Sequence, residues 1–250
     1  MSFLHDPPLV MAVMPAYNAA RTLESIHGAI PPGAVGEVLL VDDGSTDETI
    51  NIARTLPITI ISLPHNVGYG GNQKVCCLEA LQREADVVVM LHPDGQYDPA
   101  VIPDLVAPIL DGTADLVLGS RMLVPGQARS GGMPLYRFVA NKLLTAVENA
   151  ALGTSASELH TGYRAYSQEF LKIVPFLRNS NNFVFDTQLI AQAIAFSQRL
   201  VEVPISTRYH PQASSTSWKA NLGYGCATLF TMLRWRLHKA GIVKCNLFRR

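Results

Sequence analysis

Residues 37–48 read EVLLVDDGSTDE, an aliphatic run that stops at two aspartates, a glycine and a serine. A short continuous apolar run is typical of a strand buried on both faces of a parallel sheet. Ser45 is followed three residues later by Glu48, the spacing of a capping box, which predicts a helix from Ser45 to about Leu56. Strand, polar turn and helix in this order predict one βα unit of an α/β fold.

Comparable units lie on both sides of this one. Further strands are predicted at Leu9–Met14, Ile58–Leu63, Val87–Leu91 and Asp115–Leu118. Helices are predicted from about Gly71 to Glu84 and from Pro99, a good first-turn residue, to about Leu110. After a Gly-, Pro- and Ser-rich stretch at residues 120–134, which predicts a mobile loop, helices follow at about Leu135–Leu152 and Asp186–Phe196, with a strand near Leu200–Ile205. The pattern predicts an α/β fold with a mainly parallel central sheet flanked by helices.

Composition excludes several classes of protein. Lys and Arg number 20, as do Asp and Glu, so the overall charge gives no reason to expect a nucleic-acid partner. No stretch reaches the roughly 18 apolar residues of a membrane span, and the N-terminus lacks the pattern of a signal peptide. The four cysteines form no C-x-x-C pair, and two of them, Cys76 and Cys77, are adjacent. A reduced, cytoplasmic location is therefore expected.

Polar side chains follow four of the predicted strands. They are Pro15-Ala16-Tyr17-Asn18, Asp42 to Asp47, His92-Pro93-Asp94-Gly95-Gln96 and Gly119-Ser120-Arg121. Ligands of open α/β sheets bind outside the carboxyl ends of the strands, so these clusters are expected to meet at one edge of the sheet. Asp42 and Asp43 alone are equally explained by a turn and a helix cap. The four clusters in this order are more specific.

These motifs resemble those of family 2 glycosyltransferases with the GT-A (nucleotide-diphospho-sugar transferase) fold, and among them the polyprenyl-phosphate sugar synthases of the dolichol-phosphate mannose synthase type. That family has a P-x-Y-N turn, a V-D-D-G-S turn, a D-x-D-x-Q motif, a G-S-R and a later S-G-[FY]-R. The matching segments here are Pro15–Asn18, Val41–Ser45, His92–Gln96, Gly119–Arg121 and Thr161–Arg164. The resemblance covers roughly residues 9 to 217.

The resemblance implies a donor site. Pro15, Tyr17, Asn18 and either Asp42 or Asp43 would bind the base and ribose of a nucleoside diphosphate sugar, with Arg121 also in the donor site. Gly68 begins the segment Gly68-Tyr69-Gly70-Gly71, which in the family packs near the base; read alone, it is a weak, incomplete dinucleotide fingerprint because Gln73 stands where the third glycine would fall.

The resemblance also implies a divalent metal, Mn²⁺ or Mg²⁺. Such hard cations prefer oxygen ligands, which Asp94 and Gln96 can supply. His92 replaces the first acidic residue of the D-x-D motif. It is expected either to ligate the metal or to contact a phosphate oxygen, and the alternative is a structural histidine at a strand end.

Basic residues are expected near the phosphates. Arg137, which closes the stretch Met133-Pro134-Leu135-Tyr136-Arg137, matches a family arginine that lies near the lipid phosphate and the diphosphate. His210 stands where the family has another arginine, and Arg208 is expected to take over its phosphate contact. Planar guanidinium groups suit bidentate phosphate contact. Without the resemblance, each of these side chains would be interpreted as solvated surface.

The sequence offers more than one candidate for the group that activates the acceptor. Candidates for a general base are Glu158, which aligns with a family aspartate, His160 and Asp186, with Arg164 nearby in the Thr161–Arg164 motif. Asp186 is equally explained as a favourable charge in the first turn of a helix. A sugar hydroxyl needs a general base, whereas an ionised phosphate does not.

Residues 218–250 are predicted to form a separate C-terminal element beyond a glycosyltransferase domain at residues 1–217. Basic and aromatic residues at 218–240 predict an amphipathic helix that suits an anionic membrane surface. The alternatives are a helix packed on the domain with a solvated basic end, or a homodimer contact. A protein that is peripheral on the inner face of the membrane is therefore expected.

The sequence thus predicts an inverting hexosyltransferase. Its donor would be of the GDP-mannose or UDP-glucose type and its acceptor a polyprenyl or dolichyl phosphate. The runner-up is transfer to a soluble or glycan hydroxyl. A non-catalytic nucleotide-sugar-binding protein is the alternative of another class, because His92 removes a carboxylate from the metal motif. The 120–134 loop is predicted to close over the donor.

Overall fold

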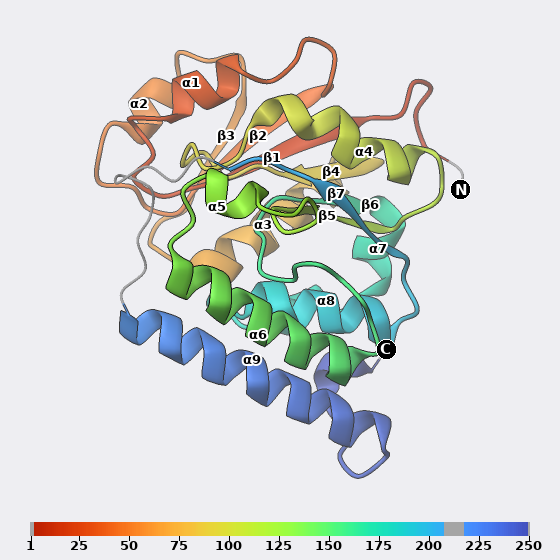
Figure 1. Cartoon of the computed structure of the whole chain (residues 1–250). Coiled ribbons are helices and arrows are strands. Elements are labelled where there is room, and N and C mark those ends of the chain that lie inside the picture. Colours follow the sequence, from red (N-terminus) through yellow and green to blue (C-terminus); the bar gives the residue numbers. More distant parts are fainter. Residues whose placement is uncertain (1–2, 208–217, 250) are drawn as a thin grey trace.

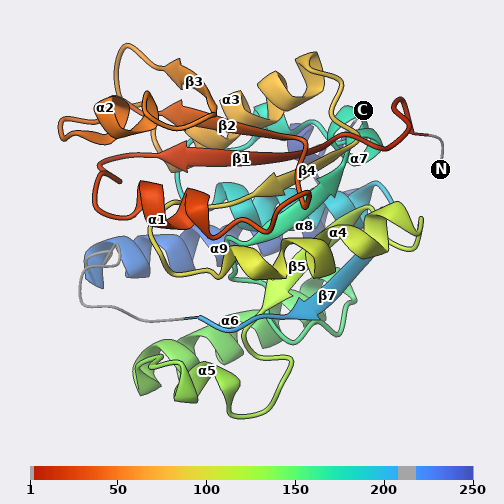
Figure 2. The same cartoon turned by 90° about the horizontal axis from the view of Figure 1, so that it is seen from above.

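A seven-stranded mixed sheet forms the centre of the protein in the computed structural model, which describes residues 3–207 and 218–249. The strand order is β3-β2-β1-β4-β6-β5-β7, which Figure 2 shows from one edge of the sheet to the other. The strands are β1 (Val10–Ala16), β2 (Glu37–Asp42), β3 (Thr59–Ser62), β4 (Val87–Met90), β5 (Leu116–Ser120), β6 (Arg164–Ser167) and β7 (Leu200–Pro204). The mainly parallel α/β sheet predicted from the sequence is confirmed, with each predicted strand found within two residues of its expected ends.

One strand was not predicted. β6 lies antiparallel between β4 and β5, with Ala165 opposite both Val89 and Val117. Its sequence, Arg-Ala-Tyr-Ser, has no apolar run, because two of its four side chains are polar although all four are buried. The strand places Arg164 and the preceding Thr161–Tyr163 turn beside the end of β4.

Helices cover both faces of the sheet (Figure 1). On one face, α1 (Leu23–Gly28) and α4 (Ile102–Leu110) bury Leu23, Leu105 and Ile109 against the strands. On the other, α3 (Tyr69–Gln82) and α8 (Phe185–Ala195) bury Cys76, Cys77 and other apolar side chains. The remaining helices are α2 (Thr49–Ala53), α5 (Gln127–Ser130), α6 (Leu135–Leu152), α7 (Gln168–Ile173), α9 (Trp218–Lys239) and the short η1 (Pro99–Val101), η2 (Phe176–Arg178) and η3 (Asn246–Phe248).

The capping box predicted at Ser45 is wrong. α2 begins only at Thr49, and its first turn is closed by Asp47, whose Oδ1 accepts a hydrogen bond of 3.0 Å from the backbone N–H of Thr49. The hydroxyl of Ser45 accepts instead from the backbone N–H of Asn18 at 2.8 Å. Ser45 therefore ties the loop after β2 to the loop after β1, which moves the start of the helix four residues along.

The C-terminal helix α9 packs against α6 and α8, and its Met232 and Trp235 belong to the same buried cluster as α3 and α8. The part of residues 218–250 that the structure describes thus shares the hydrophobic core of the preceding domain. Within residues 3–207 and 218–249, no helix has both the length and the apolar character needed to cross a bilayer. The loop predicted at 120–134 contains one helical turn, α5.

Candidate active site

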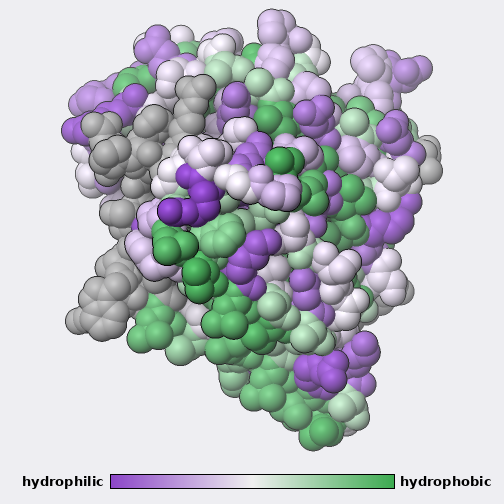
Figure 3. Space-filling view, in the orientation of Figure 1, coloured by the Kyte–Doolittle hydropathy of each residue, from purple (hydrophilic) through white to green (hydrophobic). Residues whose placement is uncertain are grey.

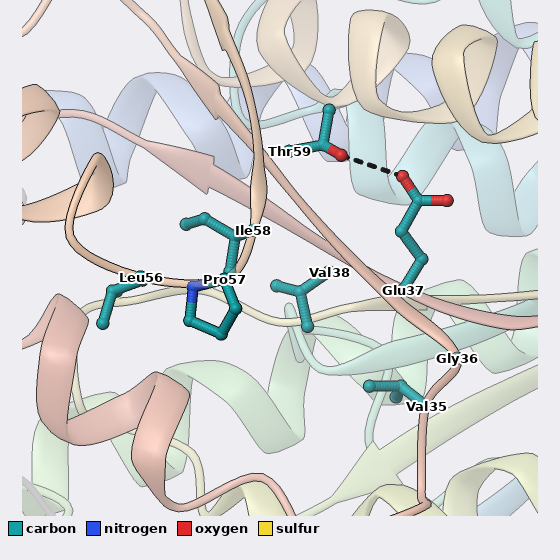
Figure 4. Close-up of a pocket in the computed structure, with 8 residues that line it drawn as sticks. All are labelled: Val35, Gly36, Glu37, Val38, Leu56, Pro57, Ile58 and Thr59. Atoms are coloured by element: carbon teal, nitrogen blue, oxygen red, sulfur yellow. Dashed lines mark hydrogen bonds between the residues drawn. The ribbon is translucent and has the colours of Figure 1, made fainter.

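A cleft of about 1080 Å³ opens at the carboxyl ends of the strands. Most residues that the sequence assigns to a site line it. They are Pro15, Tyr17, Asn18, Asp43, His92, Asp94, Gln96, Arg121, Arg137, His160 and Asp186. A smaller hollow of about 500 Å³ lies at the opposite ends of β2 and β3, where Thr59 donates a hydrogen bond of 3.0 Å to Glu37 (Figure 4). It contains none of the predicted site residues and lies at the strand ends where ligands of such sheets are not expected.

Asn18 shapes the first wall of the cleft. Its φ of 52° is a left-handed conformation that asparagine adopts more readily than most residues. Its side-chain Oδ1 accepts a hydrogen bond of 2.9 Å from the backbone N–H of Thr46, while its own N–H donates to Ser45. These hydrogen bonds tie the turns after β1 and β2 together, and Tyr17, which lines the cleft beside them, is 53% exposed. An exposed aromatic ring at this place can stack against a base.

The two aspartates after β2 have different surroundings. Asp42 is buried below the turn, where Oδ2 accepts from the Ser45 N–H at 3.0 Å. Asp43 lines the cleft and accepts hydrogen bonds from the backbone N–H groups of Val67 at 2.7 Å and Gly68 at 3.2 Å. Burial raises the pKa of Asp43, although these two hydrogen bonds counteract it. Of the pair, Asp43 is the one placed to meet a ligand.

The glycines at 68–71 are explained by a close approach of backbone. A Cβ on Gly70 would collide with the carbonyl oxygen of Ser180, and the N–H of Gly70 donates to the Asn181 carbonyl at 2.7 Å. Gly68 has φ +87°, and a Cβ there would lie 2.8 Å from the same Asn181 oxygen. The segment therefore holds the loop before α8 against the start of α3. This loop carries Phe183, which lines the cleft.

His92 faces an aromatic wall. Its ring stacks on Tyr69, with centroids 5.4 Å apart and planes 10° from parallel, and its Nε2 lies 3.3 Å from the Tyr69 hydroxyl. A Cβ on Gly162 would lie 2.9 Å from the same Nε2, so the glycine of the Thr161–Arg164 motif makes room for the ring. Burial lowers the pKa of His92, which favours the neutral imidazole. That form can ligate a metal.

Asp186 is held in a buried network. Its Oδ2 accepts from the Tyr69 hydroxyl at 2.8 Å, and its Oδ1 lies 3.3 Å from Nη1 of the fully buried Arg164. Arg164 also donates to the Thr161 carbonyl at 2.8 Å. Burial acts to lower the pKa of Arg164, but the Asp186 carboxylate and the neighbouring tyrosines together raise that pKa. Arg164 thus lies behind the cleft wall, and it neutralises Asp186 within it.

The donor set for a metal is small. Asp94 lines the cleft, and its Oδ1 accepts from the backbone N–H of Gln96 at 3.0 Å, which fixes the loop after β4. Among residues 3–207 and 218–249, no group of three or more His, Cys, Asp and Glu could hold a metal ion. One carboxylate with nearby amide and imidazole groups fits a cation that completes its shell with water and phosphate oxygens, as Mg²⁺ commonly does.

Arg121 and Glu158 form a buried ion pair at the end of β5. Nε of Arg121 donates to Glu158 Oε1 at 2.9 Å, Nη2 contacts the same oxygen, and Asn141 Nδ2 donates to it at 2.7 Å. Burial would raise the pKa of Glu158, but the charge and hydrogen bonds of Arg121 lower it below its usual value. Glu158 is fully buried and does not line the cleft, so it is placed to orient Arg121 rather than to reach a ligand.

His160 sits where three helices meet. Its Nδ1 lies 2.7 Å from the hydroxyl of Tyr224 on α9, which in turn lies 3.2 Å from Thr187 on α8. Its Nε2 lies 2.8 Å from Oε2 of Glu148 on α6, outside hydrogen-bond geometry. His160 and Tyr224 both line the cleft. Of the three predicted candidate bases, His160 and Asp186 line the cleft, whereas Glu158 does not.

Arg137 projects from the first turn of α6 into the cleft, where its Nε donates 3.1 Å to the hydroxyl of the neighbouring Tyr136. Arg208 and His210 lie outside the described residues. Sequence reasoning missed Tyr69, Tyr97 and Tyr224, all of which line the cleft. Tyr69 belongs to the Gly68–Gly71 segment, and Tyr97 directly follows Gln96 of the metal motif. Both could therefore have been found from their place beside a recognised motif. Tyr224 had none, because its position depends on how α9 packs.

The sequence model of glycosyl transferase family 2 matches residues 11–174, about two thirds of the chain. The chain belongs to this family. The protein is therefore a glycosyltransferase, and its cleft has polar motifs at the ends of β1, β2, β4 and β5. The sequence match ends before α8 and α9, so the residues that these helices contribute to the cleft lie outside it.

Three relatives show the range of similar proteins. A UDP-N-acetylglucosamine–dolichyl-phosphate N-acetylglucosaminyltransferase of Methanococcus voltae is 24% identical over 90% of this chain and 96% of its own. An undecaprenyl-phosphate mannosyltransferase of Micrococcus luteus is 29% identical over 79% of this chain and 82% of its own. Glucosyl-3-phosphoglycerate synthase of Mycobacterium tuberculosis, crystallised with Mn²⁺, UDP and phosphoglyceric acid, superimposes with a TM-score of 0.71 at 22% identity, over 96% of this chain and 81% of that one. The last likeness confirms the GT-A fold.

Proposed function

We propose that the protein transfers a hexose from a nucleoside diphosphate sugar to a polyprenyl phosphate, with inversion at the anomeric carbon. One observation carries the proposal. A single cleft is lined by Tyr17, Asp43, Asp94 and Arg137. The strand order β2-β1-β4 gives the order Asp43, Tyr17, Asp94 along the sheet edge, and Arg137 comes from α6, which follows β5 in the chain. They match, in order, a nucleoside, a diphosphate and an anionic acceptor.

The donor half of the cleft suits a nucleoside. Tyr17 offers an exposed ring for stacking, and Asp43 offers carboxylate oxygens to the N–H of a base or to ribose hydroxyls. Asp43 is held in place by the backbone of Val67 and Gly68, so it is preorganised for that contact. The proposal allows either uracil or guanine as the base of the donor nucleotide.

A divalent cation, Mn²⁺ or Mg²⁺, belongs to the proposal. Asp94 would hold it, with Gln96 and His92 nearby, and it would neutralise charge on the departing diphosphate. Arg121, held in its ion pair with Glu158, lines the cleft at the same edge with a fixed guanidinium group. A preorganised cation stabilises developing negative charge without reorganising during the reaction.

A phosphate acceptor fits the finding that two of the candidate general bases are paired with arginines. Glu158 is saturated by Arg121 and Asn141, and Asp186 is neutralised by Arg164. An ionised phosphate oxygen attacks without losing a proton, so no general base is required. Arg137 is the described cleft cation on the acceptor side best placed to bind that phosphate, because its described partner is only the neighbouring Tyr136.

Transfer to a soluble hydroxyl is the second candidate. His160 favours it, because this imidazole lines the cleft beside the acceptor half and could accept a proton. The crystal structure of the mycobacterial synthase with phosphoglyceric acid shows that a protein of this fold can bind a small anionic molecule. Both candidates share the donor half.

The first test is calorimetric titration with UDP and with GDP, each with and without Mn²⁺. We expect one nucleotide to bind in a metal-dependent manner, and Asp94→Ala to remove that dependence. Asp111→Ala, at the exposed end of α4, is the matched control and should bind like the wild type. Failure of both nucleotides to bind would overturn the donor site.

The second test is turnover with the nucleotide sugar that binds. Transfer to undecaprenyl phosphate, with none to hydroxyl acceptors, would support the proposal. Transfer to phosphoglyceric acid or another soluble acceptor, with none to the lipid phosphate, would establish the second candidate. The lipid acceptor resides in a membrane, so the proposal places the protein at a membrane surface, on the cytoplasmic side where nucleotide sugars are available.

A further inference from the structure

The zero net charge of the chain conceals a strong asymmetry. The first 120 residues carry 15 Asp and Glu but 4 Lys and Arg, whereas the rest of the chain carries 5 acidic and 16 basic residues. From Val203 to the C-terminus the sequence contains no acidic residue at all. The nucleotide-binding strands β1 to β4 therefore belong to an acidic half, and α6 and α9 belong to a basic half.

Helix α6 exposes an apolar stripe. Leu135, Val139, Leu143 and Val147 follow one another at intervals of four residues and are 61%, 55%, 66% and 38% exposed. Residues at this spacing lie on one face of a helix. The opposite face carries the buried Asn141, Thr145 and Glu148. The stripe is thus the side of α6 turned away from the core.

Helix α9 lies beside α6 and exposes a second stripe. Its members are Leu222, Leu229, Phe230 and Leu233, all more than 40% exposed. The two helices contact each other along their length (Figure 1). Figure 3 shows apolar side chains gathered over the part of the molecule where Figure 1 places α6 and α9. We name these two stripes together the α6/α9 face.

The exposed charges around this face have one sign. Lys142 on α6 and Arg236, Lys239 and Lys244 in or after α9 are exposed. The only carboxylate of α6, Glu148, is fully buried, and α9 has none. An apolar face whose described exposed charges on α6 and α9 are basic is complementary to a lipid bilayer with an anionic surface.

The face is continuous with the cleft. Tyr136, Arg137, Ala140 and Leu144 of α6 line the cleft, and Leu135, Val139 and Leu143, adjacent to them in sequence, lie in the outer stripe. α6 therefore forms a wall between the acceptor side of the cleft and the outer apolar surface. Tyr224 of α9 lines the cleft in the same way.

We propose that the α6/α9 face docks the protein on an anionic lipid bilayer, with its apolar stripes in the headgroup and upper acyl region. This deepens and rests on the proposed function, because a polyprenyl phosphate in that bilayer would meet the cleft at the first turn of α6. The acidic half, with the donor site, points away from the anionic surface. The helices lie on the membrane and do not cross it.

A second copy of the chain fits this face less well. In a two-fold symmetric dimer each patch meets its own copy, so the basic border would face an identical basic border. Like charges opposed across an interface are unfavourable. Anionic lipid supplies the opposite charge, so the charges favour the bilayer as occupant.

The test is co-sedimentation with vesicles that contain no polyprenyl phosphate, which separates docking from acceptor recognition. Phosphatidylcholine vesicles with phosphatidylglycerol are compared with phosphatidylcholine alone. The full chain should bind the mixed vesicles, and high salt should weaken that binding. The double variant Arg236→Gln/Lys239→Gln should bind about thirtyfold more weakly, since each basic residue near such a surface contributes about a fivefold factor.

Two apolar variants and two controls complete the test. Leu143→Asp and Leu233→Asp should each weaken binding roughly tenfold or more, because each removes a buried leucine from the membrane. Leu110→Asp and Arg54→Gln alter an exposed apolar and an exposed basic residue of the acidic half, and should bind like the wild type. Circular dichroism and nucleotide titration check that each variant is folded.

Several outcomes would overturn the inference. The inference fails if the full chain does not bind the mixed vesicles. It also fails if the control variants lose as much vesicle binding as the α6/α9 variants, or if the α6/α9 variants bind like the wild type. Light scattering that shows a dimer dissociated by Leu143→Asp and Leu233→Asp would assign the face to a second copy. Vesicle binding without any transfer to lipid phosphate would leave the docking inference standing and contradict the proposed acceptor.

Discussion

The hydroxyl of Tyr224 lies 2.7 Å from Nδ1 of His160 inside the cleft. Tyr224 comes from α9 and His160 from the loop before β6, so 64 residues of sequence separate the two groups. The contact joins a helix outside the family match to a loop within it. Oε2 of Glu148 lies 2.8 Å from Nε2 of the same ring but outside hydrogen-bond geometry, so the contact with Tyr224 is the described side-chain contact that orients His160.

We expect Tyr224→Phe to lower kcat/KM for the acceptor roughly tenfold, which corresponds to the loss of one hydrogen bond that orients a cleft residue. Nucleotide affinity should not change, because the proposed donor half lies at the ends of β1 and β2. Acceptor-dependent kinetics and calorimetric titration of the same variant measure the two quantities. Cys226→Ala, an exposed change two residues along α9, is the control.

The pair Arg121–Glu158 carries a prediction about stability. Glu158→Gln should lower the free energy of unfolding by about 3 kcal/mol, because it leaves the buried guanidinium of Arg121 without its counter-charge. Urea denaturation at pH 7 measures the change. The variant Glu169→Gln, which alters an exposed glutamate on α7, should stay close to the wild type.

The same pair makes stability depend on pH. The folded-state pKa of Glu158 lies below its ordinary value of 4.5, so the ion pair contributes fully above pH 4.5 and loses its contribution as the pH falls below that value. The difference in unfolding free energy between wild type and Glu158→Gln should therefore narrow in this acidic window. A difference that stays constant there would show that Glu158 is not ionised in the folded protein.

Strand and cleft positions could be predicted because each depended on local sequence. Apolar runs such as VVVM in β4 are buried on both faces, and the polar turns follow them directly. β6 was missed because its neighbours β4 and β5, not its own four residues, make it a strand. The capping box at Ser45 failed because Asn18, 27 residues away, takes the serine hydroxyl.

The roles of site residues were harder to predict than their presence. Glu158 was considered as a base because it stands near the Thr161–Arg164 motif, yet its partner is Arg121, 37 residues distant. Tyr224 carried no motif and became a cleft residue through the packing of α9 on α8. Contacts between residues that are far apart in the sequence cannot be predicted from the spacing of residues within a motif.

The close contact at the start of α3 predicts that Gly70→Ala destabilises the protein by about 2 kcal/mol, since the methyl group would overlap the Ser180 carbonyl and the Phe185 side chain. The displaced loop carries Phe183, whose ring lies 4.6 Å from that of Tyr69, so nucleotide-sugar turnover should fall as well. Thermal unfolding and activity are the measurements. Gly28→Ala, where nothing lies within 4 Å of the added methyl, should be neutral or slightly stabilising, and equal destabilisation of both variants would contradict the argument.

Arg137 distinguishes acceptor binding from the general basic character of α6. Arg137→Gln should raise the acceptor KM roughly tenfold or more, because a hydrogen bond between ionised partners contributes more than a neutral one. Lys142→Gln removes the same charge from an exposed position of the same helix that does not line the cleft, so its acceptor KM in detergent solution should stay near the wild-type value. Steady-state kinetics with undecaprenyl phosphate in detergent removes the bilayer from the comparison. If both variants raise KM equally, the acceptor responds to the charge of the helix as a whole. A selective effect of Arg137 would instead place the acceptor phosphate at the first turn of α6, where the cleft meets the apolar stripe.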